Sequence, residues 1–128
     1  MQNRTEAILS QFAESWVETE LFFDNLINDY DFERIKPVRS FISELKQKGD
    51  DRFFRLGTSV HRLLISRSVN HRLRIDQKYI MIEAYDKKFE VTLRDGRWTY
   101  RQYMIENLDL NDNRLTNLLR TLKDTLVD

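Results

Sequence analysis

Cysteine is absent from the 128 residues, which include only three glycines and one proline. Without cysteine the chain has no disulfide framework, no thiolate zinc site and no thiol nucleophile. The glycine-rich phosphate loop, the dinucleotide-binding fingerprint and the Gly-x-Ser-x-Gly elbow are all missing as well. The sequence therefore lacks the common signatures of nucleotide-binding enzymes and serine hydrolases.

Long hydrophobic runs are also missing. No apolar run approaches the roughly 20 residues that span a bilayer, and the N-terminus lacks the basic region and apolar core of a signal peptide. We therefore expect a soluble, cytoplasmic protein with no membrane partner. At 128 residues the chain is long enough for one core, which predicts a single domain over residues 1–128.

The net formal charge is zero, but the two parts of the chain differ in sign. Residues 1–51 contain 6 Lys/Arg and 11 Asp/Glu, whereas residues 52–128 contain 15 and 10, so their formal charges are −5 and +5. This split predicts either two surfaces of opposite sign or a fold in which acidic helices neutralise basic strands.

A three-stranded antiparallel meander is predicted at residues 78–105, KYIMIEAYDKKFEVTLRDGRWTYRQYMI. Asp95-Gly96 is typical of a type I′ hairpin turn, and Asp86-Lys87 is a weaker turn signal. Two-residue loops pair Tyr79 with Arg94, Ile80 with Leu93, Ile82 with Val91 and Tyr85 with Lys88 in the first hairpin. In the second hairpin they pair Leu93 with Trp98, Thr92 with Thr99 and Glu90 with Arg101.

Alternation along these strands separates two faces, because paired residues share a face. The apolar face, predicted to be core, contains Ile80, Ile82, Ala84, Phe89, Val91, Leu93, Trp98, Tyr100 and Met104. The other face contains Tyr79, Met81, Glu83, Tyr85, Lys88, Glu90, Thr92, Arg94, Arg97, Thr99, Arg101 and Tyr103.

Helices are predicted on both sides of the meander. The first, Asn3 to Asp29, is apolar over more than half its circumference, so we expect it to contact two elements or another subunit. The second begins at Pro37, stops at Gly49 and presents a stripe formed by Val38, Phe41, Ile42 and Leu45. The last follows a cap at Asn111 or Asp112 and presents a stripe formed by Leu115, Leu118, Leu119, Leu122 and Leu126.

Residues 52–74 predict a fourth strand from about Thr58 to Val69, with a short helix through His61 to Ile65 as the alternative. Arg72 is predicted to begin the strand that continues through Tyr79. The order α-α-β-β-β-β-α predicts an α+β fold with an N-terminal helical hairpin, an antiparallel sheet of about four strands and a C-terminal helix.

Catalytic and metal-binding patterns are weak. His61 and His71 have no closely spaced third ligand, and the acidic segment 28–33 lacks the glycine and closing glutamate of a calcium loop. No spacing singles out a pair of catalytic carboxylates. We therefore expect no catalytic site, no metal and no cofactor, and thus a non-enzymatic protein.

The aromatic and basic face predicts a macromolecule-binding surface. Its candidate residues are Arg52, Arg55, Arg62, Arg67, Arg72, Arg74, Tyr79, Tyr85, Lys88, Arg94, Arg97, Arg101 and Tyr103. The favoured interpretation is an interaction module (adaptor, inhibitor or immunity-type protein) that binds a protein partner or itself. A homodimer through the first helix or an edge strand would bury Phe22 and Phe23.

Two alternatives stay open. The tyrosines and arginines of the sheet could bind single-stranded nucleic acid, because bases stack on aromatic rings and cations follow phosphates. A small-molecule sensor would have an aromatic pocket near Trp16, Trp98 and Tyr100.

Overall fold

The α+β order predicted from the sequence is confirmed. The computed structural model describes residues 4–67, 78–95 and 98–124. Its helices are α1 (Arg4–Tyr30), α2 (Lys36–Gln47) and α3 (Asn113–Lys123), with short 3-10 turns η1 (Glu33–Ile35) and η2 (Asp50–Arg52). Its strands are β1 (Arg55–Ser59), β2 (Arg62–Ser66), β3 (Lys78–Tyr85), β4 (Lys88–Asp95) and β5 (Trp98–Ile105). Within the described ranges, no helix combines the length and hydrophobicity needed to span a membrane.

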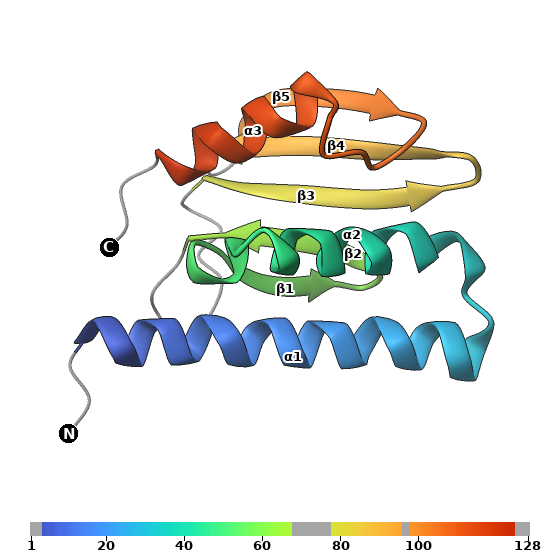
Figure 1. The fold of residues 1–128 in the computed structure, drawn as a ribbon. Coiled ribbons are helices and arrows are strands. Elements are labelled where there is room, and N and C mark those ends of the chain that lie inside the picture. Colours follow the sequence, from blue (N-terminus) through green and yellow to red (C-terminus); the bar gives the residue numbers. More distant parts are fainter. Residues whose placement is uncertain (1–3, 68–77, 96–97, 125–128) are drawn as a thin grey trace.

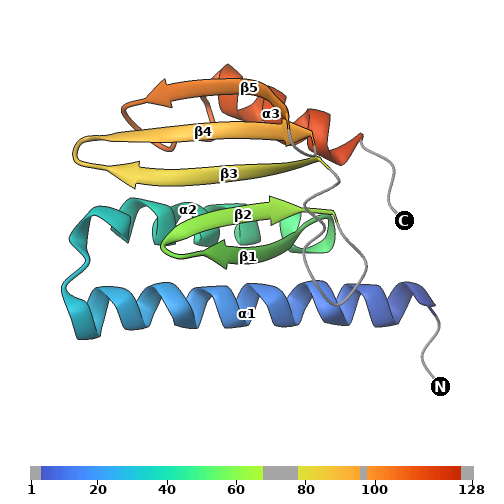
Figure 2. The same ribbon diagram turned by 180° about the vertical axis from the view of Figure 1, so that it is seen from behind.

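The five strands form one antiparallel sheet in chain order, β1-β2-β3-β4-β5. Helices α2 and α3 cover one face of this sheet, whereas α1 runs alongside β1 at one edge (Figures 1 and 2). We call the face under α2 and α3 the covered face and the opposite one the open face. The open face is turned toward the viewer in Figure 2.

The covered face and its helices enclose the core. Pro37 lies in the first turn of α2, and Asp112 caps α3 by accepting a 2.9 Å hydrogen bond from the Arg114 N–H. The chain leaves α2 through Gly49, whose φ of 85° favours a residue without Cβ. The predicted apolar stripes of α2 and of α3 as far as Leu122 pack in one cluster with Ile80, Ile82, Val91 and Leu93, and Leu126 lies outside the described residues.

The predicted register of the β3–β4 hairpin is confirmed, including the pairs Ile80–Leu93 and Ile82–Val91. Lys87, the second residue of this two-residue turn, has a positive φ of 66°. Six of the residues assigned to the core face are indeed buried beneath the helices, namely Ile80, Ile82, Ala84, Phe89, Val91 and Leu93.

The predicted register of the β4–β5 hairpin is wrong. Asp95 pairs with Trp98 and Arg94 with Thr99, but Leu93 then pairs with Arg101, so Tyr100 is an extra residue in β5. One extra residue is a β-bulge, and it moves every later side chain of the strand to the opposite face.

This bulge corrects the predicted faces. Arg101 and Tyr103 lie on the covered face, where Tyr103 packs against the core, whereas Met104 belongs to the open face and is 45% exposed. Trp98, predicted to be core, is 79% exposed at the start of β5. The structure does not describe the side chain of Tyr100.

Residues 55–66 form a hairpin where one strand from Thr58 was predicted. Ser59 pairs with Arg62 across a two-residue turn at Val60-His61, and Val60 has a φ of 59°. A β-branched residue is disfavoured at positive φ, so the sequence contains no turn signal here. The alternative helix through Ile65 is also wrong, and Val69, Arg72 and the predicted start of the next strand lie outside the described residues.

Candidate functional site

The predicted binding residues do not form one surface. Pairing and alternation place six of them on the open face: Arg55, Arg62, Tyr79, Tyr85, Lys88 and Arg94. Arg101 and Tyr103 lie on the covered face, and Arg52 lies in η2. The Arg67 guanidinium donates to the backbone oxygen of Lys123 in α3. Arg72, Arg74 and Arg97 lie outside the described residues.

Carboxylates interrupt the basic character of the open face. Glu83 and Glu90 are a cross-strand pair. Arg62 donates to Glu83 at 2.6 Å, and this hydrogen bond raises the pKa of the guanidinium. Glu90 accepts from Gln102 at 2.6 Å and from the Tyr85 hydroxyl at 3.2 Å. Desolvation and the charge of Glu90 both raise the pKa of Tyr85. The positive charge of Arg62 is thus compensated within the protein.

Arg55 connects the sheet to α1. Its side chain is buried, its Nη2 donates to the Gln11 Oε1 at 2.8 Å, and its guanidinium lies 5.9 Å from the centre of the Phe12 ring. Burial lowers the pKa of Arg55, and the charge of Glu18 acts in the opposite direction. Arg55 therefore stabilises the contact between α1 and β1, and little of it is accessible to a partner.

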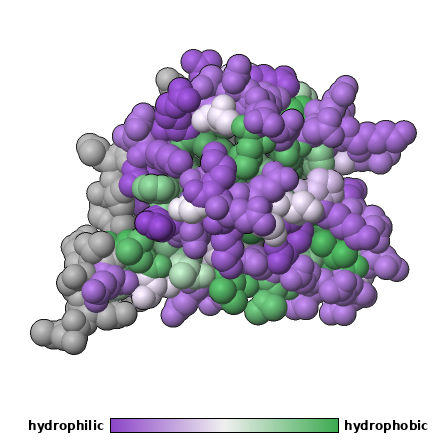
Figure 3. All heavy atoms as spheres, viewed as in Figure 1, coloured by the Kyte–Doolittle hydropathy of each residue, from purple (hydrophilic) through white to green (hydrophobic). Residues whose placement is uncertain are grey.

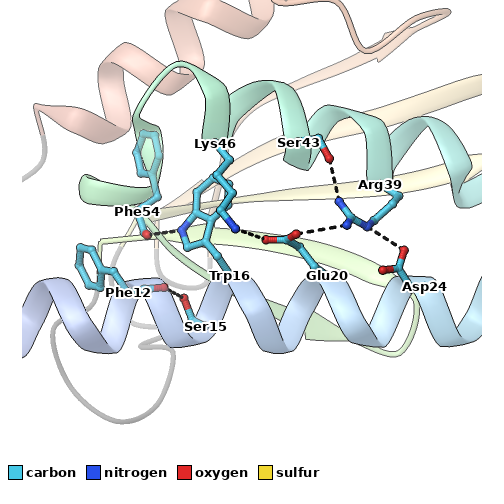
Figure 4. A network of polar contacts seen from close by, with 9 residues as sticks. All are labelled: Phe12, Ser15, Trp16, Glu20, Asp24, Arg39, Ser43, Lys46 and Phe54. Carbon is cyan, nitrogen blue, oxygen red and sulfur yellow. Dashed lines mark hydrogen bonds and ion pairs between the residues drawn. The ribbon is translucent and has the colours of Figure 1, made fainter.

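Hydrogen bonds from α1 to the chain around β1 fix the position of this helix (Figure 4). Trp16 is fully buried, and its indole N–H donates to the backbone oxygen of Phe54 at 2.8 Å. The Ser15 hydroxyl accepts from the Leu56 N–H at 3.0 Å and donates to the Phe12 backbone oxygen at 2.6 Å. Side chains of α1 thus satisfy backbone groups at the outer edge of the sheet.

Ion pairs fix α1 to α2 on its other side (Figure 4). The Arg39 guanidinium donates to Asp24 at 2.8 Å, to Glu20 at 3.2 Å and to the Ser43 hydroxyl at 2.8 Å. Lys46 donates to Glu20 at 2.9 Å. Two acidic residues of α1 are therefore neutralised by bases from the same acidic half of the chain, not by the basic strands.

The side of α1 that faces away from α2 and β1 exposes apolar side chains. Val17 and Leu21 are 51% and 57% exposed, and Ala13 and Leu9 continue the same line at intervals of four residues. Figure 3 shows apolar atoms among hydrophilic ones on the side of the molecule that α1 forms. We call this line the α1 outer surface.

Helix α1 differs from the other helices in this respect. Five exposed large hydrophobic residues lie on α1, which are Leu9, Val17, Leu21, Phe22 and Tyr30, whereas none lies on α2 or on the described part of α3. The sequence indicated an excess of apolar residues in this helix but not which of them would stay exposed. Phe23, predicted to be buried by a dimer, is already buried in its own core.

The other predicted sites find no geometric support among the described residues. Trp16 has no exposed surface while Trp98 projects from β5, so the two do not line a common aromatic pocket. The His61 ring lies tilted by 36° against the Phe32 ring with ring centres 5.2 Å apart, and His71 lies outside the described residues. No three or more metal-ligating side chains meet in the described part of the chain.

Comparison with protein-family models, with curated proteins and with solved structures finds no match to this chain.

Proposed function

We propose that this protein is a non-enzymatic interaction module that binds a protein partner through the α1 outer surface. The observation that carries the proposal is the concentration of exposed apolar side chains on one helix whose other sides are fixed by hydrogen bonds and ion pairs. Contiguous exposed apolar surface marks interaction sites on small proteins, and a rigid element presents such a site without a large cost in ordering.

The charge around the α1 outer surface defines the chemistry of the partner. Glu6, Glu14 and Glu18 are exposed on α1, and the only basic residue of this helix is Arg4 at its start. A basic amphipathic helix complements this surface, with apolar side chains toward Val17 and Leu21 and cations toward the glutamates. A second copy of α1 would place carboxylates against carboxylates, so self-association through this helix is disfavoured.

Binding of single-stranded nucleic acid stays a prediction from the sequence. On the open face, Glu83 and Glu90 lie on the strands that present Tyr79 and Arg94. Carboxylates repel the phosphates that supply most of the affinity of such complexes, so the protein partner is favoured.

Photo-crosslinking in native cell extract tests this proposal. A photoreactive side chain at position 17 or 21 should give one discrete adduct, and the matched control at Asn117, which is exposed on α3, should not. The crosslinked segment of the identified partner should be basic and amphipathic. The double variant Val17→Ser with Leu21→Ser should weaken binding of the purified partner by roughly 10- to 100-fold. No adduct, adducts of equal yield at position 117, or a self-adduct would each overturn it.

A further inference from the structure

A cavity of about 560 Å³ opens at the end of the sheet, away from the α1 outer surface. Its walls come from η1, α2, the β3–β4 turn, the start of β4 and the connection from β5 to α3, and none of its lining residues belongs to α1. These segments converge at the right-hand end of the molecule in Figure 1. The volume falls in the range of small-ligand sites, roughly 300–1,000 Å³.

The floor of this cavity is apolar. Phe41 of α2 and Phe89 of β4 are core residues that also line it, and Pro37 and the half-buried Leu108 add apolar wall. Because Phe41 and Phe89 are packed in the core, the floor exists before any ligand arrives.

Carboxylates stand around this floor on three different elements. Glu44 belongs to α2, Asp86 to the β3–β4 turn and Glu106 to the segment after β5, and all three are exposed. Within the described residues, none of the three forms an ion pair.

The other charged residues of the lining do not cancel these three. Glu33 is paired with Lys36 at 2.6 Å, and the Arg34 guanidinium lies over the Phe32 ring at 4.8 Å. Arg34 keeps its positive charge in this contact, so Arg34 and Lys87 are the two cations of the lining, against four carboxylates, Glu33, Glu44, Asp86 and Glu106. The rim therefore attracts positive charge, while the floor favours hydrocarbon.

We infer that this cavity binds an amphiphilic organic cation, a primary ammonium or guanidinium group on an apolar stem. The stem lies on Phe41, Phe89 and Leu108, and the cationic head reaches the carboxylates of Glu44, Asp86 and Glu106. Lysine and arginine side chains behave in this way, because their methylene stems pack on apolar surface while their charged ends stay in polar surroundings. The same chemistry occurs in free diamines and guanidino compounds. The site does not depend on the proposed function, because no α1 residue takes part.

Titration of the intact protein, followed by backbone amide NMR shifts, tests the inference. The probes are cadaverine and agmatine as free cations, and Nα-acetyl-lysine and Nα-acetyl-arginine N-methylamides as protein side chains. Nα-acetyl-norleucine N-methylamide is the uncharged control. We expect the cations, and not norleucine, to shift amides near Pro37, Asp86 and Glu106, with affinity falling as salt rises. Tighter binding of the capped amino acids would assign the site to a protein partner, and tighter binding of the free cations would assign it to small amines.

The decisive variant is Glu44→Gln with Glu106→Gln, which keeps side-chain size and removes two charges. It should weaken cation binding by roughly three- to tenfold. The matched control, Glu14→Gln with Glu18→Gln on α1, should leave the affinity unchanged. Asp86→Asn is a second, independent variant with the same expected direction. Equal affinity in parent and variants, equal binding of norleucine, or no saturable binding of any cation would overturn the site and would leave the proposed function of α1 untouched.

Discussion

The two edges of the sheet differ in how their backbone is protected. At β1, α1 lies along the edge, with Ser15 bonded to the Leu56 N–H and Trp16 to the Phe54 carbonyl just before the strand. No helix of the described chain runs along the outer edge of β5 (Figures 1 and 2). Trp98 and Met104 of this strand are exposed. An edge strand presents backbone groups that can pair with another chain, so an unprotected edge is a liability.

The unprotected edge strand, β5, is nevertheless irregular. The bulge at Tyr100 interrupts its ladder, and Arg101 places a charge on the covered face of the sheet. Both features hinder the addition of another strand. Helix α1 thus has two roles, because one of its sides completes the β1 edge and the opposite side presents the α1 outer surface.

We expect the largest difference in stability between substitutions of the two tryptophans, one of which lies at each edge of the sheet. Trp16→Ala removes a fully buried ring and its hydrogen bond, so we expect the free energy of unfolding to fall by about 3–5 kcal/mol. Trp98→Ala truncates a ring that is 79% exposed, so the free energy of unfolding should change by less than about 0.5 kcal/mol. Urea denaturation followed by far-UV circular dichroism measures both. Comparable losses would show that the β5 edge is as structured as the β1 edge.

The next effect tests whether α2 holds α1 against the β1 edge. Arg39→Ala breaks a network in which the side chains of Arg39 and Glu20 are only 22% and 18% exposed, so we expect a loss of about 1–2 kcal/mol. The control Arg120→Ala, on the exposed side of α3, should cost less than about 0.5 kcal/mol. The difference between the two should shrink in high salt, and a difference insensitive to salt would contradict an electrostatic origin.

A smaller loss of stability should follow when the hydrogen bond to one backbone N–H of the β1 edge is removed. Ser15→Ala removes the acceptor of the Leu56 N–H, which should cost about 1 kcal/mol before the gain in helix propensity from alanine is counted. Ser40→Ala, at an exposed position of α2, supplies the same propensity gain without that hydrogen bond. Hydrogen exchange of the Leu56 amide should accelerate in the Ser15 variant alone. Unchanged protection there would mean that the hydroxyl does not satisfy this edge.

The smallest effect concerns the β5 edge. Trp98→Lys should leave stability within about 0.5 kcal/mol of the parent and should reduce self-association at high protein concentration, because an edge lysine opposes strand addition. Val60→Lys changes another exposed apolar residue, in the β1–β2 turn, and serves as the control. Sedimentation velocity over a concentration series measures association. A stronger reduction by the Val60 variant would place the association elsewhere.

The sequence predicted those parts of the fold in which local pattern and packing agree. The β3–β4 register followed from strict alternation, and the buried stripes of α2 and α3 followed from helical spacing. The β4–β5 register failed for two reasons. Asp95 was predicted in the turn but pairs with Trp98 as the last residue of β4, and nothing in the sequence around Tyr100 marks a bulge. The β1–β2 hairpin was missed because Val60-His61 contains no residue that favours positive φ.

The candidate surfaces were harder to predict, since they depend on which neighbours each residue acquires. The excess of apolar residues in α1 was visible, but Trp16 and Val17 are adjacent in sequence and only the positions of α2 and β1 decide which one is buried. Arg55 was predicted to contact a partner and is instead buried between α1 and β1. The lining of the cation-binding cavity includes residues more than 70 positions apart in the chain, such as Glu33 and Leu108, so no local sequence pattern predicts it.

The order of the strands has a kinetic consequence. Each strand pairs with its neighbours in the chain, and three of the four connections span only two residues, so β-pairing can grow by successive addition with a low entropy cost of loop closure at those steps. Docking of α1 is different, because the Trp16–Phe54 hydrogen bond joins residues separated by 38 positions. We therefore expect the sheet to form before the helix docks, and a chain newly released from the ribosome to pass through a state in which both edges are bare.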